Sequence, residues 1–125
     1  MTDLIASMAA SASGMAAQSA RMRLVGENIA NADTPGYHRK LVSFESLAAG
    51  TVETGSVMLD QTALTRHFDP SHPMADAGGY YDGSNVNLVL EIADAREAQR
   101  SYEANLRLFD QARQMASSAL SLLRR

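Results

Sequence analysis

Two long stretches with the hydrophobic period of a helix occupy the ends of the chain. In the first, apolar and small residues recur at alternating steps of four and three, the heptad spacing of a helix that packs against another helix. This spacing predicts a helix from about Asp3 to Asn31. Its predicted seam consists of Met1, Ile5, Met8, Ala12, Met15, Ser19, Met22, Gly26 and Ile29.

The second stretch predicts a helix from about Asn87 to Leu123, with Leu88, Ala95, Tyr102, Phe109, Ala116 and Leu123 recurring every seven residues. Asn87 is its predicted N-cap, because an asparagine side chain accepts hydrogen bonds from the first turn. We expect Tyr102, Asn105 and Phe109 to pack against the first helix. At ~1.5 Å per residue the second helix is about 55 Å long. A chain of this size cannot cover such a helix alone, so we expect contacts with other chains as well.

Between the helices the pattern changes to short strand-like runs and turn residues. All three prolines lie between residues 35 and 83. Leu41–Phe44 is a predicted strand, 57–60 and 63–68 are predicted strands of a hairpin around Asp60 and Gln61, and 69–84 is a predicted loop.

The predicted fold is therefore mainly α, with two long terminal helices pairing as an antiparallel coiled coil and a small central β-hairpin module with loops. The predicted division is an N-terminal helix over 1–32, a central turn, β-rich module and loop over 33–86, and a C-terminal helix over 87–125. The two helices form one core domain in this division.

Composition and charge exclude several classes of function. The chain of 125 residues has 14 acidic and 11 basic residues, a net charge of −3. It lacks the basic stripe of a nucleic-acid-binding protein, so we expect no nucleic-acid partner. No apolar run approaches the roughly 18 residues of a membrane span, so we expect no direct membrane insertion. The first basic residue is Arg21, which argues against a cleaved signal peptide. The absence of cysteine excludes disulfides and thiolate sites.

The histidines offer the one candidate for metal chemistry. His67, His72 and Asp76 lie close together in the sequence, and a small metal-dependent enzyme using them is one hypothesis. The two histidines occupy a strand end and a position between prolines, which is not the rigid frame that a metal site requires. We therefore predict no catalytic residue, no cofactor and no metal.

A more specific motif follows the first helix, from Asn28 to Tyr37. Asn31 is expected to adopt the left-handed conformation that ends many helices. Pro35 and Gly36 fit the two central positions of a type II turn, with Thr34 before them and Tyr37 after them. Neither feature explains Asn28, which lies one turn before the helix end, where we expect it to hydrogen-bond to a neighbouring backbone.

The run from Ser13 to Glu27, followed by the motif from Asn28 to Tyr37, resembles the N-terminal signature of the bacterial flagellar rod and hook proteins. A second region, comprising Asp69–Tyr80, Asn85–Asn87 and Arg100–Asn105, is similar to the small proximal rod proteins of that family. The resemblance implies a structural subunit without enzymatic activity. Its helix-exit and assembly motif comprises Asn28, Asn31, Thr34, Pro35, Gly36 and Tyr37.

The resemblance also implies partners and a location. The terminal helices of many subunits would polymerise into the tubular drive shaft of the basal body, in the periplasm. Partners would be copies of the chain itself, other proximal and distal rod proteins, and the junction with the inner-membrane ring and export gate. The subunit would leave through the flagellar type III export system without signal cleavage. Two alternatives stay open: another type of small axial rod subunit, and a helical adaptor of the export system that never polymerises.

Overall fold

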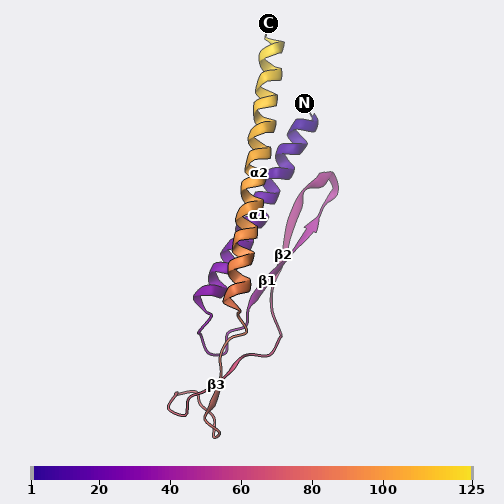
Figure 1. Cartoon of the computed structure of the whole chain (residues 1–125). Helices are drawn as coiled ribbons and strands as arrows, with labels where there is room; N and C mark the ends of the chain where they lie inside the picture. Colours follow the sequence, from indigo (N-terminus) through magenta and orange to yellow (C-terminus); the bar gives the residue numbers. More distant parts are fainter. Residues whose placement is uncertain (1, 125) are drawn as a thin grey trace.

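Two long helices dominate the computed structural model, which describes residues 2–124. Helix α1 spans Thr2–Ala30 and helix α2 spans Leu88–Leu123, so both predicted helices are confirmed to within one residue at each end. The helices pack along one another, and the start of α1 and the end of α2 lie at the same end of the pair (Figure 1). The Asn87 side chain caps α2 by accepting hydrogen bonds from the backbone N–H groups of Val89 and Leu90.

The contact between the helices is built from small side chains. Among residues 2–124, the buried apolar residues are Ala17, Leu24 and Val25 on α1 and Ala98 and Ala112 on α2. Three of these five are alanines, which allow two helix backbones to approach closely but bury little apolar area each. The helix pair is therefore narrow, and its own core contributes modestly to stability.

The large apolar side chains of the predicted α1 seam do not form this contact. Ile5 is 57% exposed and Ile29 is 38% exposed. Met8, Met15 and Met22 are half-buried beside the contact. Within one chain the buried residues of this helix are Ser11, Ala17, Leu24, Val25 and Asn28, which lie on a different face from the predicted seam. The predicted seam stays a prediction for contacts with other chains.

On helix α2, too, the buried row differs from the row that the sequence predicts. Tyr102, Asn105 and Phe109 are half-buried. The residues buried on α2 are Glu91, Ala98 and Ala112, a row on the seven-residue spacing that also includes Asn105. Large apolar residues on other faces of this helix remain exposed, namely Leu88, Val89, Leu90, Ile92, Leu106, Leu108, Met115, Leu120, Leu122 and Leu123.

A long hairpin lies beside α1 (Figure 1). Strand β1 (Lys40–Ser46) pairs antiparallel with β2 (Val52–Leu59), and a 3₁₀ turn at Ala48–Gly50 connects them. The Val52 N–H donates a hydrogen bond to the Ser13 hydroxyl at 3.0 Å, which ties the tip of the hairpin to the helix. The predicted strand at Leu41–Phe44 is thus confirmed as the centre of a longer one.

The predicted hairpin around Asp60 and Gln61 is wrong. Strand β3 (Arg66–Phe68) pairs instead with β4 (Tyr80–Asp82), which lies inside the predicted loop. The rings of Phe68 and Tyr80 face each other across this pair, with their centroids 5.0 Å apart. Arg66 lies opposite Asp82. These contacts join residues that are separated by the whole 69–79 loop, so no local pattern reveals them. The β3–β4 pair projects beyond the end of the helices (Figure 1).

Gly14 on α1 lies directly against Asn105 on α2. A Cβ atom at this position would lie 2.8 Å from Nδ2 of Asn105, whose amide donates to the Ser101 carbonyl at 3.0 Å. Gly14→Ala in an Asn105→Ala background is expected to stabilise the chain by about 1 kcal/mol, the usual helix preference for alanine. In the native background the gain is expected to vanish, because Asn105 must turn away and lose its bond. Urea unfolding of the four chains measures the difference, and equal effects in both backgrounds would contradict this contact.

Candidate assembly junction at the helix exit

The chain turns sharply where α1 ends, through the predicted Pro35–Gly36 turn. The Tyr37 N–H donates to the Thr34 carbonyl at 3.2 Å, and Gly36 has a φ of 76°. These are the features of a type II turn, whose third residue requires a positive φ and favours glycine. The Gly36 N–H donates to the Gly83 carbonyl at 3.0 Å, which attaches the turn to the segment that follows β4.

Asn31 acts differently from the prediction. Ala49 is the one non-glycine residue with positive φ in the described part of the chain, so Asn31 is not in the left-handed conformation. Its side-chain amide donates instead to the Glu27 carbonyl at 2.9 Å. Its oxygen accepts from the Thr34 hydroxyl at 3.1 Å. Its backbone N–H donates to the same Glu27 carbonyl at 3.0 Å. Asn31 therefore closes the last turn of the helix with both its backbone and its side chain, without a left-handed conformation.

Asn28 joins the helix end to the start of β1. Its side chain is almost fully buried, with 1% of the residue exposed. Its Oδ1 accepts from the Tyr37 hydroxyl at 2.8 Å and from the Lys40 N–H at 2.9 Å. Its Nδ2 donates to the Lys40 carbonyl at 3.1 Å and to Oε2 of Glu91 at 3.4 Å. The expected bond to a neighbouring backbone is thus present. The Asn28 side-chain amide pairs with both the N–H and the carbonyl of Lys40, as the backbone of an adjacent β-strand would. Burial raises the pKa of the Tyr37 hydroxyl, which keeps it a donor.

Glu91 and Arg39 form the centre of the junction. Glu91 lies on the first turn of α2 and is fully buried. Nε of Arg39 donates to its Oε1, and Nη2 of Arg39 donates to Oδ2 of Asp94 at 3.0 Å. Burial alone would lower the pKa of the Arg39 guanidinium. The hydrogen bond to Glu91 and the negative charges of Glu91, Asp94 and Asp60 together outweigh this effect and raise the pKa.

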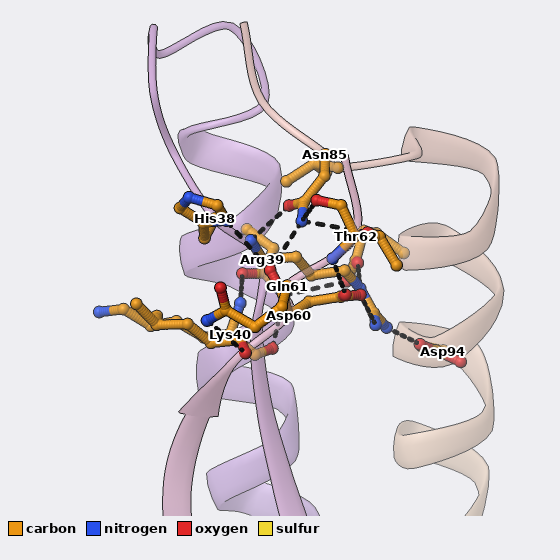
Figure 2. Close-up of polar contacts among 12 residues, drawn as sticks. His38, Arg39, Lys40, Asp60, Gln61, Thr62, Asn85 and Asp94 are labelled. Atoms are coloured by element: carbon orange, nitrogen blue, oxygen red, sulfur yellow. Dashed lines mark hydrogen bonds and ion pairs between the residues drawn. The ribbon is translucent and has the colours of Figure 1, made fainter. Parts of the chain in front are cut away.

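The end of β2 completes this network (Figure 2). Arg39 and Asp60 lie 3.8 Å apart as an ion pair, and the Asp60 N–H donates to the Arg39 carbonyl at 2.7 Å. The Asn85 side chain accepts from the Arg39 N–H and donates to the carbonyls of Asp60 and Thr62. The Asp60 carboxylate accepts hydrogen bonds from the N–H and the hydroxyl of Thr62, and these bonds lower its pKa.

A further arginine extends the network along the helices. Nη2 of Arg21 on α1 lies 3.3 Å from Oδ1 of Asp94 and 3.4 Å from Oε2 of Glu97, both on α2. Lys40 lies 3.0 Å from Glu27. The polar network therefore connects α1, β1, the end of β2 and the start of α2, and it fixes the angle at which the hairpin leaves the helices.

Sequence reasoning did not identify Arg39, Glu91 or Asp94 as site residues. A charged residue is expected at the surface, and nothing local distinguishes Glu91 from the exposed acids of α2. One signal was available. Glu91 lies seven residues before Ala98, which is itself in the row of small residues on α2, so a carboxylate there must be buried if that row faces α1.

The geometry supports a structural junction. Within residues 2–124, no three histidine, aspartate or glutamate side chains are grouped so that they could hold a metal ion. His72 stacks on Tyr81 with the ring centroids 3.8 Å apart, and the alternative of a metal site at His67, His72 and Asp76 has no support in this part of the chain. Neither α1 nor α2, as far as the structure describes them, combines the length and hydrophobicity needed to cross a bilayer.

Two family models match the two ends of the chain. Residues 8–38 match the family described as "Flagella basal body rod protein", and residues 77–122 match "Flagellar basal body rod FlgEFG protein C-terminal". The first match contains the helix-exit motif, and the second contains the whole start of α2. The helix-exit motif and the start of α2 therefore fall inside regions typical of flagellar basal-body rod proteins, whereas Arg39, Lys40 and Asp60 lie between the two matched regions.

Similar curated proteins narrow the family. The flagellar basal-body rod protein FlgC of Agrobacterium fabrum is 40% identical, over 99% of this chain and 98% of its own length. FlgC of Salmonella typhimurium is 35% identical, over 88% of this chain and 90% of its own length. FlgC of Borreliella burgdorferi is 30% identical, over 96% and 97% respectively. The chain belongs to the FlgC family of flagellar basal-body rod proteins.

Proposed function

We propose that this chain is a non-enzymatic structural subunit of the proximal rod of the bacterial flagellar basal body. Its two terminal helices pair with each other as an antiparallel coiled coil, and through these helices the subunits polymerise into the tubular drive shaft. Membership of the FlgC family supports the rod assignment. Its partners are copies of itself, other proximal and distal rod proteins, and the junction of the inner-membrane ring with the export gate. Its place is the periplasmic rod, reached through the type III export system.

The observation that carries polymerisation is the exposed apolar surface of the helix pair. Ile5, Ile29, Leu88 and Leu123 are each between 38% and 79% exposed, and they lie on the heptad rows predicted for helix packing. A chain that worked alone would cover such rows, because contiguous apolar surface marks a contact site. Contacts between different faces of identical subunits generate open helical assemblies.

We propose a separate role for the helix-exit motif, comprising Asn28, Asn31, Thr34, Pro35, Gly36 and Tyr37. In this role the motif holds the hairpin at a fixed angle to the helices, so that every subunit presents the same surfaces to its neighbours. The cap at Asn87 and the packing of Tyr102, Asn105 and Phe109 give α2 the matching position. The predicted seam residues Ile5, Met8, Met15, Met22 and Ile29 contact helices of adjacent subunits.

The double variant Asn28→Ala with Asn31→Ala tests this role in cells that carry it in place of the native chain. It removes the bonds to Lys40, Tyr37 and the Glu27 carbonyl and leaves the exposed helix faces unchanged. We expect non-swarming cells, little of the chain in isolated basal bodies, and secretion close to normal, because export requires an unfolded chain.

Gln114→Ala, an exposed position on α2, is the matched control and is expected to swarm normally. Normal swarming of the double variant would contradict the role of the motif. Absence of the unsubstituted chain from basal bodies would contradict the rod function itself.

A further inference from the structure

The β3–β4 pair carries an aromatic face that stays exposed in the described part of the chain. Phe68 is 64% exposed and Tyr80 is 44% exposed. They lie opposite one another, as do Arg66 and Asp82, so these four side chains share one face of the two-stranded sheet. We call this set the arm face. Strands β3 and β4 pack chiefly against each other, and the pair extends away from the helices (Figure 1).

The arm has a negative charge. Residues 66–82 contain one arginine and three aspartates, Asp69, Asp76 and Asp82, which leaves a net charge of −2 with the histidines neutral. Arg66 is already engaged: it lies 2.7 Å from Asp76, 3.7 Å from Asp82 and over the ring of Tyr80. The arm therefore offers aromatic rings surrounded by carboxylates, and its one cation is occupied within the arm.

The exposed side of α2 provides a surface with the opposite character. A shallow hollow of about 520 Å³ is lined by Val89, Ile92, Ala93, Arg96, Glu97 and Arg100, which we call the helix hollow. Val89 is 75% exposed and Ile92 is 48% exposed. Within residues 2–124, Arg96 and Arg100 form no ion pair, whereas Glu97 already faces Arg21. The hollow thus combines an apolar floor with two available guanidinium groups.

We propose that the arm face of one subunit docks into the helix hollow of a second copy of this chain. Phe68 and Tyr80 would cover Val89 and Ile92, while Arg96 and Arg100 would meet the aspartates and the aromatic rings of the arm. Arginine interacts favourably with both carboxylates and ring faces. The arm extends from the end of the helices, so this contact joins different surfaces of two copies and repeats from one subunit to the next. The inference rests on the proposed rod function.

Photo-crosslinking in isolated basal bodies tests this contact. Phe68 is replaced by p-benzoylphenylalanine, a photoreactive residue of similar shape. On irradiation we expect an adduct of twice the chain mass, with the attachment mapped by mass spectrometry to residues 88–100. Arg96→Glu with Arg100→Glu is expected to lower the adduct yield at least about fivefold, the combined effect of losing two exposed ion pairs. Arg107→Glu, another exposed arginine of α2, is the matched control and is expected to leave the yield unchanged.

Other results would overturn the proposal. A chain that enters basal bodies without a self-adduct, or with an adduct to a different protein, contradicts the contact but leaves the rod function intact. If the Phe68 variant is not incorporated, the same residue at Ile92 serves as the reciprocal probe, and its adduct must then map to residues 66–82. Absence of the unsubstituted chain from basal bodies would instead contradict the rod function.

Discussion

Arg39→Ala is expected to lower the free energy of unfolding by about 4 kcal/mol, more than any other truncation in the junction. The cost arises from the buried carboxylate of Glu91, which remains in the variant without its partner. Glu91 is fully buried, and without Arg39 its carboxylate keeps only the Asn28 amide, at 3.4 Å. A buried charge without its partner is far more costly than the pair is favourable.

The reverse truncation is expected to cost less. Glu91→Ala leaves Arg39 with Asp94 at 3.0 Å and Asp60 at 3.8 Å, and 22% of the arginine side chain stays in contact with water. We expect a loss of about 2 kcal/mol for this variant. Replacing both residues, as Arg39→Met with Glu91→Leu, is expected to cost less than the sum of the two truncations, because no charge is left without a partner.

Urea unfolding followed by helical circular dichroism measures this order, and swarming in soft agar reports its effect in cells. Glu103→Ala, which removes an exposed carboxylate from the same helix, is the control and is expected to change little. If Glu91→Ala proves as costly as Arg39→Ala, or costlier, then the burial of the carboxylate does not dominate the junction.

Asn28→Asp is expected to cost about 4 kcal/mol, roughly twice the cost of Asn28→Ala, although it changes the shape of the side chain least. The amide nitrogen of Asn28 donates to the Lys40 carbonyl and to Glu91. A carboxylate has no proton to donate, so one of its oxygens would face two acceptors, the Lys40 carbonyl and the buried carboxylate of Glu91. Asparagine is therefore required for its donor as well as its size.

The protonation state provides a second test of this prediction. The Asn28→Asp variant is expected to be less destabilised at acid than at neutral pH, since protonation of the new carboxyl restores a donor and removes the repulsion. Asn31→Asp is the control at the same helix end, where the side chain donates a single bond to the Glu27 carbonyl. Equal stability of Asn28→Asp and Asn28→Ala at neutral pH would contradict the role of the donor.

The sequence was most informative about local features. Helix ends, the Asn87 cap and the turn at Pro35 and Gly36 depend on residues within a few positions of one another, and the structure contains each of them. The pairing of β3 with β4 was missed because Tyr80–Asp82 lies among glycines and far from its partner. A strand of three residues leaves almost no pattern of its own, so its neighbour in space decides its structure.

The choice of helix face failed for a different reason. The heptad spacing on α1 selects a row that includes Ile5, Ile29 and three methionines. The contact between the helices instead selects small residues such as Ala17 and Ala98, together with one acid, Glu91. In a subunit whose surfaces serve both its own fold and neighbouring chains, apolar size does not reveal which of the two contacts a residue makes.

The narrow contact between α1 and α2 separates two kinds of evolutionary constraint. Ala98 is fully buried and Gly14 faces the Asn105 side chain, so the size of the residue at either position is limited by contacts within the same molecule, whatever surrounds the subunit. The bulky outer residues meet no such limit within the chain and can vary freely in size, provided that the surfaces they touch vary with them. Along one helix, positions that face the other helix should therefore accept only small residues. Positions on the outer face should change together with the residues that they contact on neighbouring subunits.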